Sequence, residues 1–206
     1  SLHAARARVL IRSGRLDEAR AWARDHAVVD ADPTDFARED EVLTYARLVA
    51  AERRAGRSND REIEHVLTLT EQIVTAAERA RRSGSRVEAL TVRSLALAAA
   101  DAPADDTLAA AVTPGVAAGY ARLFLDEGAP LRELLGRLAA AGGPDGDAAR
   151  GLLLDQPRNA TVTAKTDMVV EVIERRDFKG LLEAYPDLYA PLLQATAHQL
   201  AENEGH

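Results

Sequence analysis

Apolar residues recur at helical spacing along most of the chain. Leu2, Ala5 and Val9 are three or four residues apart, which predicts a helix over 2–12. The segment Ser13-Gly14-Arg15 ends this helix, and a second one begins directly after it with two acidic residues in its first turn, where the helix dipole favours negative charge. The pattern therefore predicts an antiparallel pair of helices joined by a short turn.

Two further helix starts carry the residues of a capping box. Asn59 is followed three residues later by Glu62, and Ser85 is followed in the same way by Glu88. In this motif the first side chain accepts a hydrogen bond from a backbone N–H of the first turn, and the acid reaches back to the N–H of the cap residue. We therefore expect long helices from Asn59 to about Ser83-Gly84 and onward from Ser85.

The remaining helices have weaker boundary signals. A helix is expected between Asp35 as its N-cap and Gly56 as its end, with Phe36 on its apolar stripe. Shorter helical segments are expected at 106–125 and 130–141. Short connections between helices of this length force antiparallel neighbours, so residues 1–141 are predicted to form an all-α domain of helix pairs.

The composition changes at 142–150, where glycine, proline and aspartate predict a flexible linker. Beyond it, apolar residues at 161–164 and 168–173 predict two short strands, and the segments 176–184 and 188–202 predict two closing helices. The predicted fold class is thus mainly α: helix pairs followed by a small strand-strand-helix-helix segment over 151–206.

Composition and charge narrow the function. Among 206 residues, 47% are hydrophobic and only 4% aromatic, which suits alanine-rich packed helices better than a β-sandwich. The net charge of −7 opposes binding to a phosphate backbone. There is no cysteine and no apolar run long enough to cross a membrane, so we expect a cytoplasmic protein. Since the chain starts with Ser1 instead of Met, we expect it to be part of a longer protein.

No residue pattern indicates catalysis or metal binding. The histidines are scattered without a companion ligand, and neither a nucleophile elbow nor a glycine-rich nucleotide loop is present. We therefore expect no enzyme, no metal and no cofactor. Trp22, the single tryptophan, is interpreted mainly as a core residue between helices, with contact to a binding partner as the alternative.

Four segments together carry a resemblance to a known family. The turn and helix start at 13–19 is typical of tetratricopeptide (TPR) repeats. The segments 38–47, 86–98 and 119–128 follow in the expected order, and the last reads Gly-Tyr-Ala-Arg-Leu-Phe-Leu-Asp-Glu-Gly. Over residues 1–141 the chain resembles the MalT-like TPR region of large ATP-binding LuxR-type transcription regulators.

This resemblance implies a regulatory scaffold. In the family, the TPR region follows an ATPase module and precedes a DNA-binding helix-turn-helix, and it relays the binding of an inducer or partner. This chain contains neither module, so the resemblance implies binding of a protein segment or a small inducer, with DNA contacted only through the missing helix-turn-helix of the parent. The segment 113–116 is more broken than the corresponding helix of the family. The oligomeric state stays open.

A second resemblance concerns the tail. The segment 152–162 resembles the phosphate-binding cassette of cyclic-nucleotide-binding domains, which implies Arg158 and Asn159 as ligands of a cyclic phosphate. The glutamate of that family, which binds the ribose, would fall at Ala149, and the preceding barrel strands are replaced by the helical region. A cyclic-nucleotide-responsive module is therefore the alternative function, and a fusion of two incomplete modules is a third interpretation.

Overall fold

The computed structural model describes residues 1–29 and 31–154, which form helices, turns and short loops and contain no strand. The helices of this part are α1 Leu2–Arg12, α2 Leu16–Asp25, α3 Glu39–Arg54, α4 Asp60–Arg79, α5 Ser83–Ala99, α6 Asp105–Ala117, α7 Ala121–Leu125, α8 Ala129–Ala141 and α9 Gly143–Leu154. The predicted TPR-like helical fold of the first region is confirmed.

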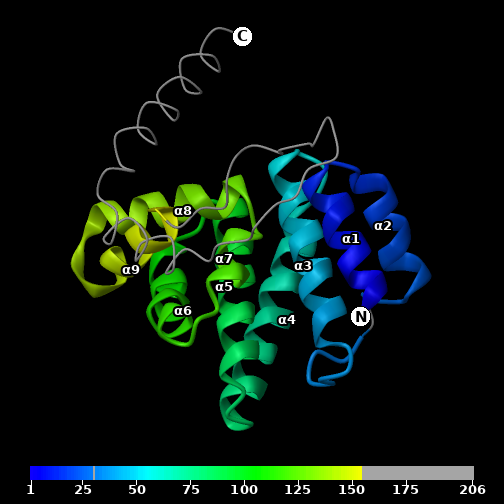
Figure 1. Cartoon of the computed structure of the whole chain (residues 1–206). Coiled ribbons are helices and arrows are strands. Elements are labelled where there is room, and N and C mark those ends of the chain that lie inside the picture. Colours follow the sequence, from blue (N-terminus) through cyan, green and yellow to red (C-terminus); the bar gives the residue numbers. More distant parts are fainter. Residues whose placement is uncertain (30, 155–206) are drawn as a thin grey trace, which may run out of the picture. The chain divides into compact units, whose positions relative to one another are not determined.

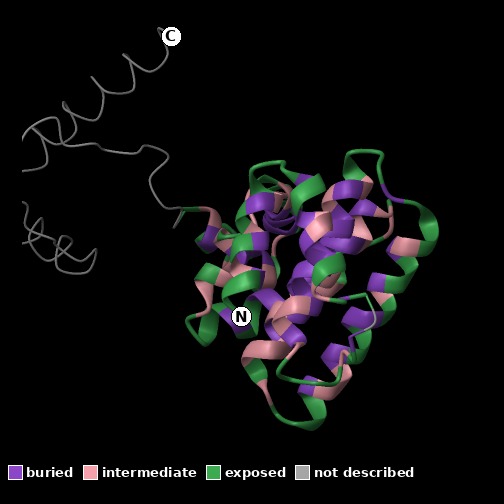
Figure 2. Cartoon of the chain, turned by 90° about the vertical axis from the view of Figure 1, so that its right-hand side faces the viewer, coloured by how far each residue is buried: buried purple, intermediate pink, exposed green. Residues whose placement is uncertain are grey.

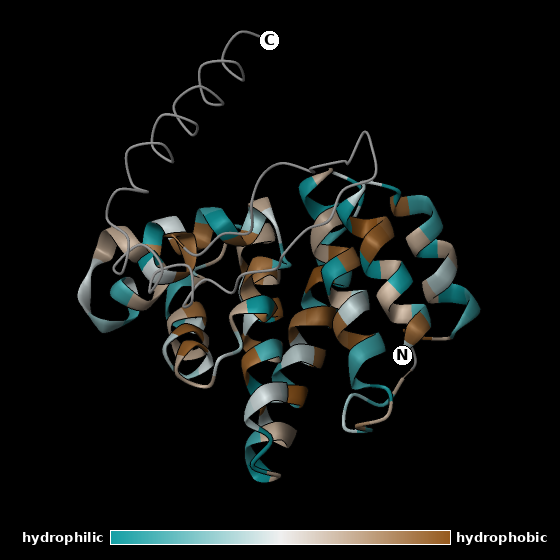
Figure 3. Ribbon diagram, in the orientation of Figure 1, coloured by the Kyte–Doolittle hydropathy of each residue, from teal (hydrophilic) through white to brown (hydrophobic). Residues whose placement is uncertain are grey.

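Except for α6 and α7, consecutive helices pack against each other as neighbours, from α1 and α2 at one end to α8 and α9 at the other (Figure 1). The helices α1, α3 and α5 also pack directly side by side, as expected when successive helix pairs stack in a solenoid. Buried positions gather inside this stack (Figure 2), and each helix carries hydrophobic and hydrophilic residues along its length (Figure 3). None of the described helices is long and apolar enough to cross a membrane.

The central helix α3 is the most buried of the stack. Its apolar residues Val42, Leu43, Leu48 and Val49 are fully enclosed. Three charged residues of α3 are also buried, and each is paired with residues outside α3: Glu39 with Arg82, Arg47 with Glu88 and Glu127, and Glu52 with Arg20. Because a buried charge is stable only when it is paired, each of these three positions requires a residue of opposite charge against α3.

The two predicted capping boxes have different outcomes. The Asn59 side chain accepts from the Glu62 N–H at 3.0 Å, and the Glu62 carboxylate accepts from the Asn59 N–H at 3.3 Å, so the first box is confirmed. The second is wrong: α5 already begins at Ser83, and the Ser85 hydroxyl accepts from Arg82. Glu88 does not cap because it pairs with Arg47 of α3.

The predicted N-cap of α3 at Asp35 is three residues too early, since the N-cap is Arg38. The Asp35 carboxylate accepts from the Ala37 N–H at 2.9 Å within a turn, and α3 begins only at Glu39. Phe36 is not on the apolar stripe, since it is 66% exposed and the Arg82 guanidinium stacks on its ring at 4.7 Å. In this cation–π contact the guanidinium covers a face of the Phe36 ring, which at a core position would pack against apolar side chains.

Near its end, α6 continues through the Pro-Gly pair that suggested a broken helix. Pro114 lies inside α6, and the Ala110 carbonyl four residues earlier, which receives no N–H from proline, accepts from Arg86 Nη1 at 3.4 Å. Helix α6 then ends at Ala117, and the segment expected at 106–125 is divided between α6 and α7. Gly115 allows this packing, since a Cβ there would lie 2.7 Å from the Phe124 ring.

The stretch predicted as a flexible linker forms part of a packed helix. Gly142 and Gly143, with φ of 77° and 73°, make the sharp turn between α8 and α9. Gly146 lets α9 approach α8 closely, because a Cβ on it would lie 2.9 Å from the Leu138 carbonyl oxygen. The glycines of this stretch therefore serve a tight turn and a close helix contact, and they do not make it a flexible linker.

The predicted strands at 161–173 and the helices at 176–184 and 188–202 lie outside the described residues. The division into a repeat domain and a separate tail, and the cyclic-nucleotide-like nature of that tail, therefore stay predictions.

Candidate functional site

A cleft in the described part of the chain lies across α1, α3 and α5 and the connection between α7 and α8. Its volume is about 590 Å³. It is lined by arginines and acids from these elements and by apolar side chains that include Ala5, Val9, Ile11, Ala51, Leu95 and Leu123. A cleft of this size with an apolar wall and a few convergent polar groups is typical of a small-molecule or peptide site.

At the cleft a buried arginine joins three parts of the chain. Arg47 Nε donates to Glu127 Oε1 at 2.7 Å, and its Nη2 donates to Glu88 Oε1 at 2.9 Å. The Arg47 side chain is only 8% exposed. Burial alone would lower the pKa of Arg47, but the charges and hydrogen bonds of Glu127 and Glu88 outweigh it and raise the pKa above its ordinary value. We call these residues the Arg47 triad.

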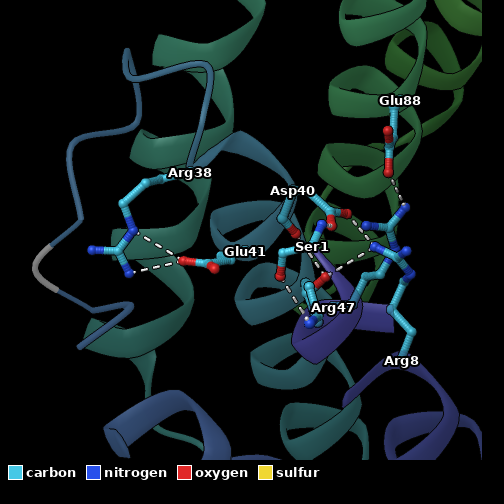
Figure 4. A network of polar contacts seen from close by, with 9 residues as sticks. Ser1, Arg8, Arg38, Asp40, Glu41, Arg47 and Glu88 are labelled. Carbon is cyan, nitrogen blue, oxygen red and sulfur yellow. Dashed lines mark hydrogen bonds and ion pairs between the residues drawn. The ribbon is translucent and has the colours of Figure 1, made fainter. Parts of the chain in front are cut away.

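A second group of charges extends the network toward the N-terminal end of α3. Arg8 of α1 pairs with Asp40, and its Nη1 also donates to the Thr44 hydroxyl at 3.3 Å. Figure 4 shows the contact of Arg8 with Asp40 together with the ion pair of Arg47 and Glu88. Burial would raise the pKa of Asp40, but hydrogen bonds from the chain's amino group and Arg8 hold it below its usual value. The network thus binds α1, α3 and α5 together along one side of the cleft.

Two lining arginines are not matched by an acid. Within the described residues, neither Arg12 nor Arg54 has a carboxylate within 4.0 Å. Arg12 donates only to the backbone oxygen of Asp126, at 3.3 Å. The pKa of Arg54 is lowered because the surrounding protein removes water from its guanidinium, and Glu133 and Glu127 offset this only in part.

The Arg47 triad also joins three of the segments that carry the family resemblance. Arg47 ends the segment 38–47, Glu88 lies in 86–98, and Glu127 lies in 119–128. Within the last segment, Phe124 is buried against Gly115, and Gly128, with φ of 74°, precedes α8 as its N-cap. Residues that are far apart in the sequence thus have a shared structural role on the cleft.

Comparison with known families agrees with this arrangement. A family model described as the MalT-like TPR region matches residues 1–141. The chain belongs to this family. Neither a curated protein nor a solved structure matches the chain. Membership makes the MalT-like TPR region of this chain a helical-repeat regulatory scaffold of a MalT-type regulator, and TPR-like regions in general are scaffolds for protein interaction.

Trp22 lies away from the cleft of the MalT-like TPR region. Its side chain is 8% exposed and belongs to the hydrophobic core. Trp22 also lines a smaller hollow of about 300 Å³ between α1 and α2. In this hollow the ring centroids of His3 and His26 are 5.0 Å apart. These two histidines, scattered in the sequence, are therefore neighbours in space. A role for Trp22 in binding a partner stays a prediction.

The other predicted ligands, Arg158 and Asn159, lie outside the described residues. Among the described residues, no group of three or more His, Asp or Glu side chains could hold a metal ion.

The sequence did not single out the residues that make up the cleft. Arg47 carried a signal, because it is the one charged residue within the otherwise apolar run from Tyr45 to Ala51 and therefore required a buried partner. Nothing local pointed to Glu88 or Glu127 as that partner, since they lie 41 and 80 residues away.

Proposed function

We propose that this region is the sensor of a LuxR-type transcription regulator and binds a protein segment or a small inducer in the cleft across α1, α3 and α5. The observation that carries the proposal is the position of the Arg47 triad, which joins α3, α5 and the α7–α8 connection directly at the cleft. A ligand seated there would contact all the elements that the triad holds together.

The proposed mechanism is a shift in the packing of these elements. A ligand changes an equilibrium only when it interacts differently with the two states. In the cleft it would contact α1 and α3 on one side and the α7–α8 connection on the other, so it would favour the arrangement in which both surfaces are correctly spaced. The parent regulator would read this change through its other modules, without catalysis by the repeats themselves.

DNA binding would be left to a helix-turn-helix of the parent regulator. The net charge of this chain is −7, so its long-range field repels a phosphate backbone. In an electrophoretic mobility assay with duplex DNA at 50 mM salt, we expect no shift. A shift that weakens steeply with added salt would contradict this part of the proposal.

We also propose that the regulator is cytoplasmic.

The test is a screen by protein NMR with small molecules and short peptides. We expect ligands whose chemical-shift changes map to the lining of the cleft on α1, α3 and α5. Val9 is 56% exposed and lines the cleft, so Val9→Trp should fill it without disturbing the core and should remove binding.

The matched control is Val116→Trp on α6, since Val116 is 38% exposed and does not line the cleft. This control should bind as the unchanged chain does. The proposal fails if no ligand maps to the cleft, or if Val9→Trp and Val116→Trp affect binding equally.

A further inference from the structure

The charges around the cleft leave its cations in excess. Four carboxylates line it, and each one is already engaged: Asp40 by Arg8, Asp126 by Arg122, and Glu88 and Glu127 by Arg47. Five arginines line the same cleft. Arg12 and Arg54 therefore remain without a carboxylate partner in the described structure, at the C-terminal ends of the neighbouring helices α1 and α3.

The buried arginine of the cleft is itself incompletely bonded. The Nε and Nη2 atoms of Arg47 are engaged with Glu127 and Glu88, but its Nη1 has no hydrogen-bond partner within the described structure. This side chain is more than nine-tenths buried, with 8% exposed. An unsatisfied buried donor costs about 1–3 kcal/mol. Nη1 itself is enclosed, so an acceptor that reaches it from the cleft after a small shift of the lining side chains would remove that cost.

The size of the cleft and its apolar lining indicate what else the ligand must contain besides an acceptor group. Its volume of about 590 Å³ is far larger than a single inorganic ion needs. Ala51, Leu95 and Leu123 form apolar parts of the lining. A ligand that satisfies both features has an anionic group for the arginines and an apolar body for the wall.

We propose that the cleft binds a small organic anion, whose carboxylate or phosphate group accepts hydrogen bonds from Arg12, Arg54 and the free Nη1 of Arg47. Arginine suits this task because its planar N–H groups match the oxygens of both anions. The proposal rests on the proposed function, since it specifies the chemistry of the inducer that the sensor recognises.

The experiment uses three probes with one apolar body and different head groups: hexanoate, hexyl phosphate and hexan-1-ol. Each is titrated into the full chain at 50 mM salt and followed by NMR. We expect at least one anion to bind in the cleft ten times more tightly than the alcohol, and the tighter anion identifies the head group. Equal affinity of the alcohol and both anions, or no binding by any of them, would overturn the inference.

Variants assign the effect to the arginines. The double change Arg12→Gln and Arg54→Gln removes two charges that hold no acid, so the fold should persist while the anion affinity falls at least tenfold. Arg61→Gln is the matched control, because Arg61 is an exposed arginine of α4 that does not line the cleft. An unchanged affinity in the double variant, or an equal loss in Arg61→Gln, would contradict the assignment.

The contribution of the buried arginine is tested by Arg47→Lys, which keeps the charge but removes the planar N–H groups. We expect a further loss of anion affinity, with helicity by circular dichroism showing that the variant is folded. If neutral ligands from the screen bind in the cleft while anions show no preference, the inference about charge fails and the proposed sensor function stands.

Discussion

The helices α1–α5 and α6–α9 are both built from packed helix pairs, but different residues decide which surfaces meet. In α1–α5, the partners of α3 are selected by buried charges, as with Glu39 and Arg82 or Glu52 and Arg20. In α6–α9, close contact is permitted by glycines, as at Gly115 under Phe124. The packing of α1–α5 therefore depends on charged side chains that need a partner. The packing of α6–α9 depends on glycine positions where any side chain would clash.

The two regions pack together mainly through α5 and α6, and Glu127 adds a charged contact between them. This residue follows α7, and its carboxylate reaches Arg47 of α3. Because a buried charge without a partner costs more free energy than a steric clash that can relax, we expect the charged contact to be the more sensitive of the two designs.

The largest effect is expected at the Arg47 triad. Arg47→Ala leaves Glu88 and Glu127 without their shared cation, and should lower the free energy of unfolding by about 3–5 kcal/mol. Glu127→Ala should cost less, because Glu88 still pairs with Arg47. Urea unfolding of the single and double variants measures the coupling, expected to be about 0.5–3 kcal/mol. Strictly additive effects would show that the contact between Arg47 and Glu127 contributes nothing to stability.

The next effect concerns the glycine contact. Gly115→Ala places a methyl group 2.7 Å from the Phe124 ring and 2.9 Å from Val87, and should cost about 1–3 kcal/mol by thermal or urea unfolding. Gly136→Ala is the control within α8, since no atom lies within 4 Å of its Cβ position. The control should stabilise the chain by about 0.5–1 kcal/mol, because alanine restricts the unfolded chain. The same sign for both changes would refute the close-contact explanation.

A smaller effect separates the two predicted caps. Asn59→Ala removes a cap that the structure contains and should lower the free energy of unfolding by about 1 kcal/mol. Ser85→Ala should change it by less than about 0.5 kcal/mol, because Ser85 is inside α5 and does not cap it. A cost at Ser85 equal to that at Asn59 would restore the capping interpretation of that position.

The smallest effect is expected at the end of α4. Arg81 adopts a left-handed conformation with φ of 55°, which favours glycine. Arg81→Gly should therefore raise the free energy of unfolding by about 0.5–1 kcal/mol. A decrease would mean that the Arg81 side chain contributes more than the backbone strain costs.

Interactions between residues close together in the sequence could be predicted, whereas those between distant residues could not. The Asn59 and Glu62 box was predictable because both groups lie within one helical turn. Ser85 and Glu88 have the same spacing but form no capping box, because the distant Arg47 binds Glu88 instead. Likewise, the sequence predicts Gly84 near the end of the helix that starts at Asn59, but Gly84 lies within α5 against the Tyr120 ring. The left-handed residue after α4 is Arg81 instead.

The sequence by itself determined the helical class, several helix boundaries and the resemblance to the MalT-like TPR region, because periodicity, turns and caps act over a few residues. Only the tertiary structure decided the cleft, its two unmatched arginines and the Arg47 triad. The physical reason is that a buried charge requires a partner without specifying which one. For Arg47 that partner came from residues 41 and 80 positions away, which only the packing of the helices brings together.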